Sequence, residues 1–230
     1  MPVVHVNDID MYYEVAGTGP SLVVIPGLAG DISEWHAITD PLAERFRVLA
    51  FDNRGGGQTD KPDAPYTIEQ MASDAAGLLR AVGVGPATVL GVSMGGRVAL
   101  ALALDHPELV SRLILVSTGA RASRRRWLGL MGLASGLPLL RGKHPQPRYA
   151  FRHQRAATTA YNAVDRLGEI QVPTTIMHGK SDRTAPLALA EELHAGIAGS
   201  RLLTFPGGHL FLFFRERARF LDAVVQAAGG

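Results

Sequence analysis

A serine lies at the centre of Gly-Val-Ser-Met-Gly, residues 91–95, between an apolar run and a stretch of small residues. The run predicts a strand and the stretch predicts a helix, so the serine should sit on a tight strand-to-helix turn. On such a G-x-S-x-G turn the hydroxyl projects from the end of the sheet, and the N-terminus of the helix points at it. The motif therefore predicts Ser93 as the nucleophile of an acyl-transfer reaction.

A serine hydroxyl is a weak nucleophile and needs a base that an acid holds in position. Where the serine lies on this kind of turn, the chain order is serine, then acid, then histidine. Asp182 follows the strand pattern TTIMHG, and His209 follows the strand pattern RLLTF. Both should emerge at the carboxyl ends of strands, where open α/β sheets carry their sites. The sequence therefore predicts a triad of Ser93, His209 and Asp182.

Two residues compete with these assignments. His178 ends the strand that precedes Asp182, so it is an alternative base. Asp52 ends the strand pattern RVLAFD and is an alternative acid, although a turn residue that binds backbone amides explains its position better. His144 and His153 lie in a region that could touch substrate, and a surface position explains each of them better.

The negative charge that develops on a carbonyl oxygen during acyl transfer needs two N–H donors. One donor should be the amide of Met94, directly after the nucleophile. The other should come from the loop after the strand pattern SLVVI, from the amide of Leu28. Gly27 and Gly30 would let this loop approach the serine closely.

Alternating strand and helix patterns must position these residues. The strand patterns cover residues 3–6, 11–15, 21–25, 47–52, 87–92, 112–117, 174–179 and 201–205, and the helical patterns cover 33–46, 68–82, 94–105, 187–197 and 213–227. Asn7-Asp8 predicts a hairpin turn between the first two strands. Strands that alternate with helices indicate an α/β fold with a mostly parallel sheet and helices on both faces.

The alternation stops near residue 120 and resumes near residue 173. We therefore expect an α/β core made of residues 1–120 and 173–230, and a short inserted segment of residues 121–172 after the sixth strand. Residues 121–171 hold ten basic and two acidic residues, a net charge of +8, whereas the rest of the chain has a net charge of −6. Such a division of charge suggests a module with its own task.

The basic module has two interpretations. Its arginines, for which Arg152 and Arg155 are the test pair, would bind an anionic group of a substrate, or they form a solvated surface. The apolar stretch at residues 127–140 instead favours a pocket for neutral acyl chains. The run RRR at residues 124–126 is too short to indicate nucleic-acid binding, and no nucleic-acid-binding motif accompanies it.

Composition excludes several classes of protein. The chain of 230 residues contains no cysteine, which excludes a disulfide framework, a thiol nucleophile and Cys-ligated metals. The N-terminus shows no secretory signal, and the apolar stretch of 14 residues is shorter than the roughly 20 that cross a membrane. These features predict a cytoplasmic protein without a membrane partner.

The chain resembles the α/β-hydrolase fold superfamily along its whole length. The matching segments are PGLAGDISEW, FDNRGGGQTDKP, LGVSMGGRVAL, HPELVSRLILVST, HGKSDRTAP and GGHLFLF. It is similar to the branch of 3-oxoadipate enol-lactonases and small carboxylesterases, which includes cofactor-free haloperoxidases. Many relatives carry His-Gly where this chain has Pro26-Gly27, and their inserted segment, called the cap, is usually longer than the one here.

The resemblance implies a serine hydrolase that cleaves a small carboxylic ester or lactone through an acyl-enzyme, without a cofactor or metal. It implies Ser93, Asp182 and His209 as the triad and Leu28 with Met94 as oxyanion donors. Trp35, Trp127 and Phe211 are candidates for the substrate pocket, with core packing as the other explanation. Perhydrolysis, carbon–carbon bond hydrolysis and a non-catalytic small-molecule receptor remain alternatives, and both a monomer and a homodimer remain open.

Overall fold

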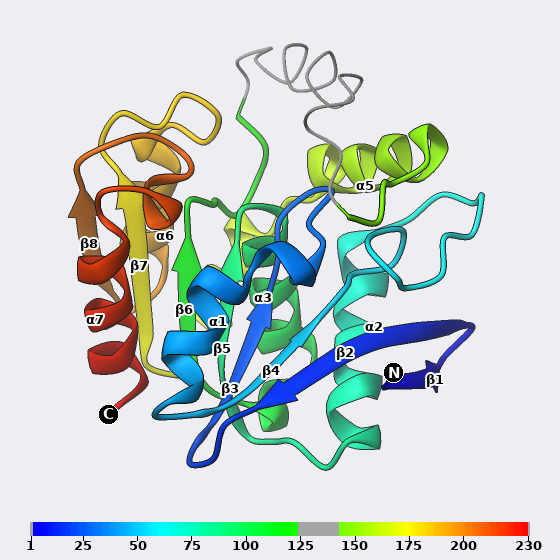
Figure 1. Cartoon of the computed structure of the whole chain (residues 1–230). Coiled ribbons are helices and arrows are strands. Elements are labelled where there is room, and N and C mark those ends of the chain that lie inside the picture. Colours follow the sequence, from blue (N-terminus) through cyan, green and yellow to red (C-terminus); the bar gives the residue numbers. More distant parts are fainter. Residues whose placement is uncertain (1, 124–142, 230) are drawn as a thin grey trace.

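The computed structural model describes residues 2–123 and 143–229. A central sheet carries helices on both faces (Figure 1). The strands are β1 (Val3–Val6), β2 (Ile9–Ala16), β3 (Ser21–Ile25), β4 (Arg47–Phe51), β5 (Ala87–Val92), β6 (Val110–Val116), β7 (Thr174–Gly179) and β8 (Arg201–Phe205). The α-helices are α1 (His36–Ala43), α2 (Ile68–Ala81), α3 (Met94–Asp105), α5 (Arg148–Ala160), α6 (Leu187–Gly196) and α7 (Arg217–Ala228). Short 3₁₀ helices are η1 (Ile32–Glu34), η2 (Pro107–Leu109), η4 (Val164–Glu169) and η5 (Phe211–Phe213).

The eight strands follow the order β1-β2-β4-β3-β5-β6-β7-β8. β2 pairs antiparallel with both β1 and β4, and every pair from β4/β3 to β7/β8 is parallel. The predicted hairpin turn joins β1 to β2, with Asn7 at a φ of 55°. The prediction of a mostly parallel sheet with helices on both faces is therefore confirmed.

Strands in the middle of the sheet are covered from both sides. All six residues of β5 and all six of β7 are buried. Parallel strands that are buried on both faces need continuous apolar runs instead of alternating ones. The bounds predicted for both strands agree with the structure, although β7 includes Thr174, Thr175 and His178.

The two faces of the sheet form two apolar clusters. Residues of α2, α3 and α6 fill one cluster, and residues of α1 and α7 fill the other. In Figure 1, α1 and α7 accordingly lie on the opposite side of the sheet from α2 and α3. Because these strands are parallel, the carboxyl ends of β3, β5, β7 and β8 lie at the same edge of the sheet.

Two predicted helices differ from the structure by more than one residue at an end. The helix expected over residues 33–46 is divided into η1 and α1, because the Asp31 carboxylate accepts a hydrogen bond from Ser33 N and caps η1 separately. The helix expected from residue 213 begins at Arg217, because η5 first packs the rings of Phe211 and Phe213 against the core.

The segment between β6 and β7 leaves and rejoins the sheet at neighbouring strands. Its described part contains α5 and η4, and α5 lies above the carboxyl ends of the strands (Figure 1, yellow-green). The predicted apolar stretch at residues 127–140, including Trp127, lies outside the described residues. None of the described helices is long and apolar enough to cross a membrane.

Arg97 of α3 ties this segment to the core. Its guanidinium is buried and donates hydrogen bonds to the carbonyl oxygens of Gly119, Arg121 and Thr158. Burial lowers its pKa to about 10. Since Thr158 lies in the last turn of α5, the arginine also places a positive charge at the negative end of that helix. One side chain on α3 thus holds both the start of the segment and the end of α5.

Candidate active site

Ser93 occupies a strained turn between β5 and α3. Its φ of 57° and ψ of −115° lie outside the regions that L-residues usually adopt. A Cβ on Gly91 would collide with the carbonyl of Gly95, and a Cβ on Gly95 would collide with the carbonyl of Ile25 in β3. Both glycines of the motif are therefore required by close approach of the backbone.

The structure brings Ser93, His209 and Asp182 together from the segments that follow three different strands, β5, β8 and β7. His209 Nε2 lies 3.0 Å from Ser93 Oγ, and His209 Nδ1 lies 2.7 Å from Asp182 Oδ2. The other oxygen, Asp182 Oδ1, accepts hydrogen bonds from the amides of Thr184 and Ala185 at 2.8 and 2.9 Å. The carboxylate is thus fixed in the position that orients the imidazole ring towards the serine.

Two residues after β6 hold the backbone of this site. Ser117 Oγ donates to the carbonyl of His209 at 3.0 Å, and Thr118 Oγ1 donates to the carbonyl of Ser93 at 2.7 Å. The sequence patterns assign no role to either residue. No sequence pattern marks these hydroxyl groups, because both bind backbone carbonyls of distant residues.

His178 also lies near the Asp182 carboxylate. Its Nε2–H donates to the carbonyl of Ala185 at 2.7 Å and lies 3.4 Å from Asp182 Oδ2. The ring is fully buried, and its Nδ1 has no hydrogen-bond partner among the described residues. Burial lowers the pKa of His178, so the ring is neutral in the folded protein. This geometry leaves His209 as the histidine that reaches Ser93.

The neutral state of His178 predicts a pH dependence of stability. Below about pH 6.5 the unfolded chain binds a proton at this histidine more readily than the folded chain does, so stability falls as pH falls. We expect the free energy of unfolding to drop by roughly 1 kcal/mol more between pH 7 and pH 5 in the wild type than in His178→Gln. Urea unfolding at both pH values measures this, and equal drops would contradict a neutral His178.

The loop after β3 approaches Ser93 directly. A Cβ on Gly27 would lie 3.2 Å from the Cβ of Ser93, so the backbone at Gly27 borders the serine. Gly30 N donates to the carbonyl of Gly27 at 3.0 Å, which closes a turn with Leu28 and Ala29 at its centre. Ala29 has a φ of 59°, a conformation that costs an alanine roughly 1–2 kcal/mol. The amide of Met94 begins α3 on the other side of Ser93.

Asp52 lies in the turn after β4 and holds backbone amides. Its carboxylate accepts hydrogen bonds from Ile32 N at 2.8 Å and from Gln58 N at 2.7 Å. Burial raises its pKa to about 6. The structure therefore places this residue as the turn residue that the sequence favoured, with its oxygens directed at loops.

The pocket candidates pack differently from each other. Trp35 is buried and meets Phe213 edge to face at 5.1 Å, within the core. Phe211 is stacked on Phe205 with the ring centroids 4.6 Å apart, and it also borders a surface hollow of about 430 Å³. The hollow is lined by Pro206, Gly207, Gly208, His209, Leu210, Phe211, Phe214, Arg215 and Glu216. Apolar space is thus available beside the imidazole of His209.

The basic pair chosen from the sequence points to solvent. Arg152 and Arg155 are exposed, whereas Gln154 between them on α5 is buried. His144 and His153 bind carboxylates, Asp31 at 2.9 Å and Asp63 at 2.9 Å respectively. This placement favours the solvated-surface interpretation for the two arginines. Among residues 2–123 and 143–229, no cluster of three or more His, Asp or Glu is arranged to hold a metal ion.

Comparison with known proteins identifies the family. A family model described as the alpha/beta hydrolase fold matches residues 20–163, so the chain belongs to that family. The crystal structure of the enol-lactonase from Burkholderia xenovorans LB400 aligns over 100% of both chains, with a TM-score of 0.86 and 27% identity. An esterase from Exiguobacterium antarcticum aligns over 99% of both chains, with a TM-score of 0.89 and 26% identity.

A sequence relative extends these comparisons. The provisionally named carbamate hydrolase RutD of Azorhizobium caulinodans is 30% identical over 244 residues, which cover 92% of each chain. The expected resemblance to the enol-lactonase and esterase branch is thereby confirmed, and membership of the family supports a hydrolase.

Proposed function

We propose that this protein is a serine hydrolase that cleaves a small carboxylic ester or lactone with Ser93, His209 and Asp182. The observation that supports it most strongly is the hydrogen-bonded line from Ser93 Oγ through His209 to Asp182, with contacts of 3.0 and 2.7 Å. Nucleophile, base and orienting acid within hydrogen-bond reach are the arrangement that activates a serine.

Each residue has one task in this mechanism. Ser93 Oγ attacks the carbonyl carbon while His209 Nε2 takes the hydroxyl proton, and Asp182 stabilises the imidazolium that results. The amides of Leu28 and Met94 donate to the oxyanion. His209 then gives the proton to the leaving-group oxygen as its bond to the carbonyl carbon breaks. An ester releases its alcohol at this step, whereas the hydroxyl of an opened lactone stays attached to the acyl group. A water molecule, deprotonated by His209, attacks the acyl carbon, and the carboxylic acid leaves as the serine regains its proton.

The choice of ester or lactone is supported by the relatives and by the surroundings of His209. Two of the similar structures are described as an enol-lactonase and an esterase. The hollow next to His209 presents Leu210 and Phe214, which are 49% and 69% exposed, to a leaving group. We further propose that residues 121–172 act as a short cap, since α5 lies over the edge that carries the site.

A fluorophosphonate probe tests the proposal. The enzyme should be labelled at Ser93, as peptide mass spectrometry would show, whereas a non-catalytic receptor of this fold should stay unlabelled. A panel of p-nitrophenyl esters of increasing chain length, enol-lactones and carbamates then defines the acyl group. Faster halogenation with peroxide than hydrolysis of every ester would instead favour the perhydrolase alternative.

A further inference from the structure

The backbone amide of Ala29, in the loop after β3, binds a side chain of the segment between β6 and β7. Ala29 N donates to Gln154 Oε1 at 3.1 Å. Gln154 lies on α5, 125 residues later in the chain, and is 1% exposed. Since the turn around Ala29 has an unfavourable φ, an external contact is needed to hold it. This contact lies one residue after Leu28, the proposed oxyanion donor.

Both ends of the Gln154 amide are used, so its orientation is determined. Gln154 Nε2 donates to the carbonyl of Arg54 at 2.8 Å. An amide whose oxygen faces an N–H and whose nitrogen faces a carbonyl cannot rotate by half a turn without losing both bonds. The side chain therefore joins the loop after β3 to the loop after β4.

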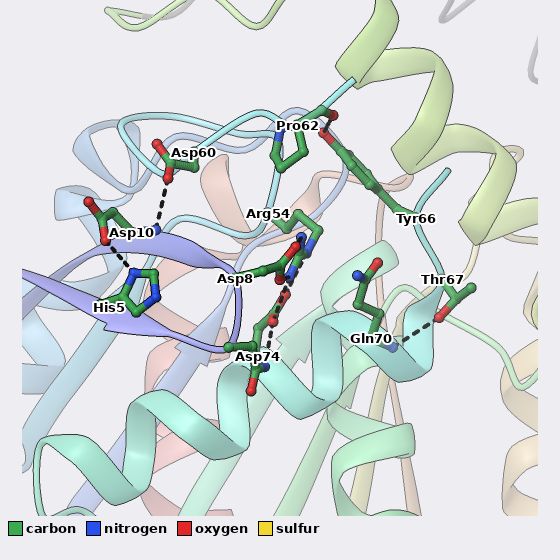
Figure 2. Close-up of polar contacts among 11 residues, drawn as sticks. His5, Asp8, Asp10, Arg54, Asp60, Pro62, Tyr66, Thr67, Gln70 and Asp74 are labelled. Atoms are coloured by element: carbon green, nitrogen blue, oxygen red, sulfur yellow. Dashed lines mark hydrogen bonds and ion pairs between the residues drawn. The ribbon is translucent and has the colours of Figure 1, made fainter. Parts of the chain in front are cut away.

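The partner loop is rigid at the point of contact. The Arg54 guanidinium is 2% exposed and donates to both carboxylate oxygens of Asp74, at 2.8 and 2.9 Å. Asp8 in the β1–β2 turn binds the same guanidinium, as Figure 2 shows. Next to Arg54, Asn53 Nδ2 donates to the carbonyl of Pro26 at 3.0 Å. This bond holds the start of the loop after β3, which carries the proposed oxyanion donor Leu28.

We infer that Gln154 is a positioning residue for oxyanion stabilisation, through which α5 holds the Leu28 amide in its donating orientation. The inference rests on the proposed function, because it assumes that Leu28 N binds the oxyanion. It adds that the segment between β6 and β7 contributes to the chemical step and does not only cover the site.

Gln154→Met is the test variant, because methionine keeps the length and volume of the side chain and removes both hydrogen bonds. Gln146→Met is the matched control: Gln146 also reaches from this segment to the loop after β4, with Nε2 donating to Gly55 O at 2.7 Å, but its side chain makes no hydrogen bond to the loop after β3 among the described residues. Direct loss of an oxyanion donor lowers kcat by about 10²–10³-fold, so an indirect loss should lower it about tenfold. KM should stay within roughly twofold, since ground-state binding is not affected.

A trifluoromethyl ketone of the best acyl chain supplies a readout that a general loss of stability would not change. Ser93 Oγ adds to its carbonyl carbon, the carbonyl oxygen becomes an oxyanion, and His209 takes the serine proton. We expect the inhibition constant of Gln154→Met to rise by the same factor as kcat/KM falls. The inhibition constant of the product carboxylic acid and the pH profile should not change.

Gln154→Glu is a second test variant, which keeps the proposal testable if Gln154→Met does not fold. In either protonation state, glutamate still offers an oxygen to Ala29 N–H, so it should lose less activity than Gln154→Met. Equal ketone inhibition of wild type and Gln154→Met, or an equal loss in Gln146→Met, would overturn the role of Gln154. A wild type that neither reacts with fluorophosphonate nor binds the ketone would instead contradict the proposed function itself.

Discussion

Replacing Ser93 by alanine should lower kcat for the best ester by roughly 10⁶-fold, because the members of such a triad act as one unit. His209→Ala should lose about as much, and combining the two changes should add little. Steady-state kinetics with a chromogenic ester, backed by single-turnover measurements for the slow variants, gives the numbers. Each variant should also lose covalent labelling by fluorophosphonate.

Folding controls decide how this result is interpreted. Ser93 keeps its unusual φ only because the surrounding backbone holds it, so Ser93→Gly should be folded and equally inactive. A circular dichroism spectrum like that of the wild type, together with lost activity, assigns the loss to the hydroxyl. Residual activity within tenfold of the wild type would show that another nucleophile carries the reaction.

Asp182→Asn should reduce kcat by roughly 10⁴-fold while the fold persists. The aspartate accepts the Nδ1–H of His209 at 2.7 Å, and this contact selects the tautomer whose Nε2 is free to take the serine proton. An asparagine that presents its NH₂ group to the ring selects the opposite tautomer. The pH dependence of kcat/KM for the variant and the wild type gives the test.

Near-full activity in Asp182→Asn would mean that the acid is wrongly assigned, and Asp52 would be the next residue to replace. The structure offers a direct contrast between the two carboxylates. Asp182 presents one oxygen to an imidazole, whereas both oxygens of Asp52 accept backbone amides. We therefore expect Asp52→Asn to change stability more than it changes the chemical step.

The strands and the three proposed catalytic residues were predictable for a physical reason. A parallel strand that is covered on both faces needs a largely apolar sequence. The loop after its carboxyl end is free to carry polar side chains. Ser93 directly follows β5, whereas Asp182 and His209 lie in the loops that follow β7 and β8. Local sequence therefore carries their position, and the topology of the sheet brings them together.

The supporting residues were not predictable in this way. Gln154 and Ser117 act on backbone atoms 125 and 92 residues away. Every residue type carries these backbone atoms, so the sequence does not show which of them form such a bond. The sequence patterns did not predict the short 3₁₀ helices η1 and η5, for a related reason. Their bounds depend on one capping carboxylate and on ring packing against distant strands, which a periodicity of apolar residues does not record.

The direct pairing of β6 with β7 has a consequence for how this protein could diversify. Because these strands are parallel neighbours, the chain leaves the carboxyl end of β6 and re-enters the sheet at the amino end of β7, whatever the length of the segment between them. Doubling the length of such a segment costs only about 0.6 kcal/mol of closure entropy. One stretch of chain could thus be exchanged for another, with a new range of substrates, while the strands that bear serine, aspartate and histidine stay in register. Grafts that keep a glutamine opposite Ala29 should retain their turnover, and grafts that omit it should bind new substrates but turn them over slowly.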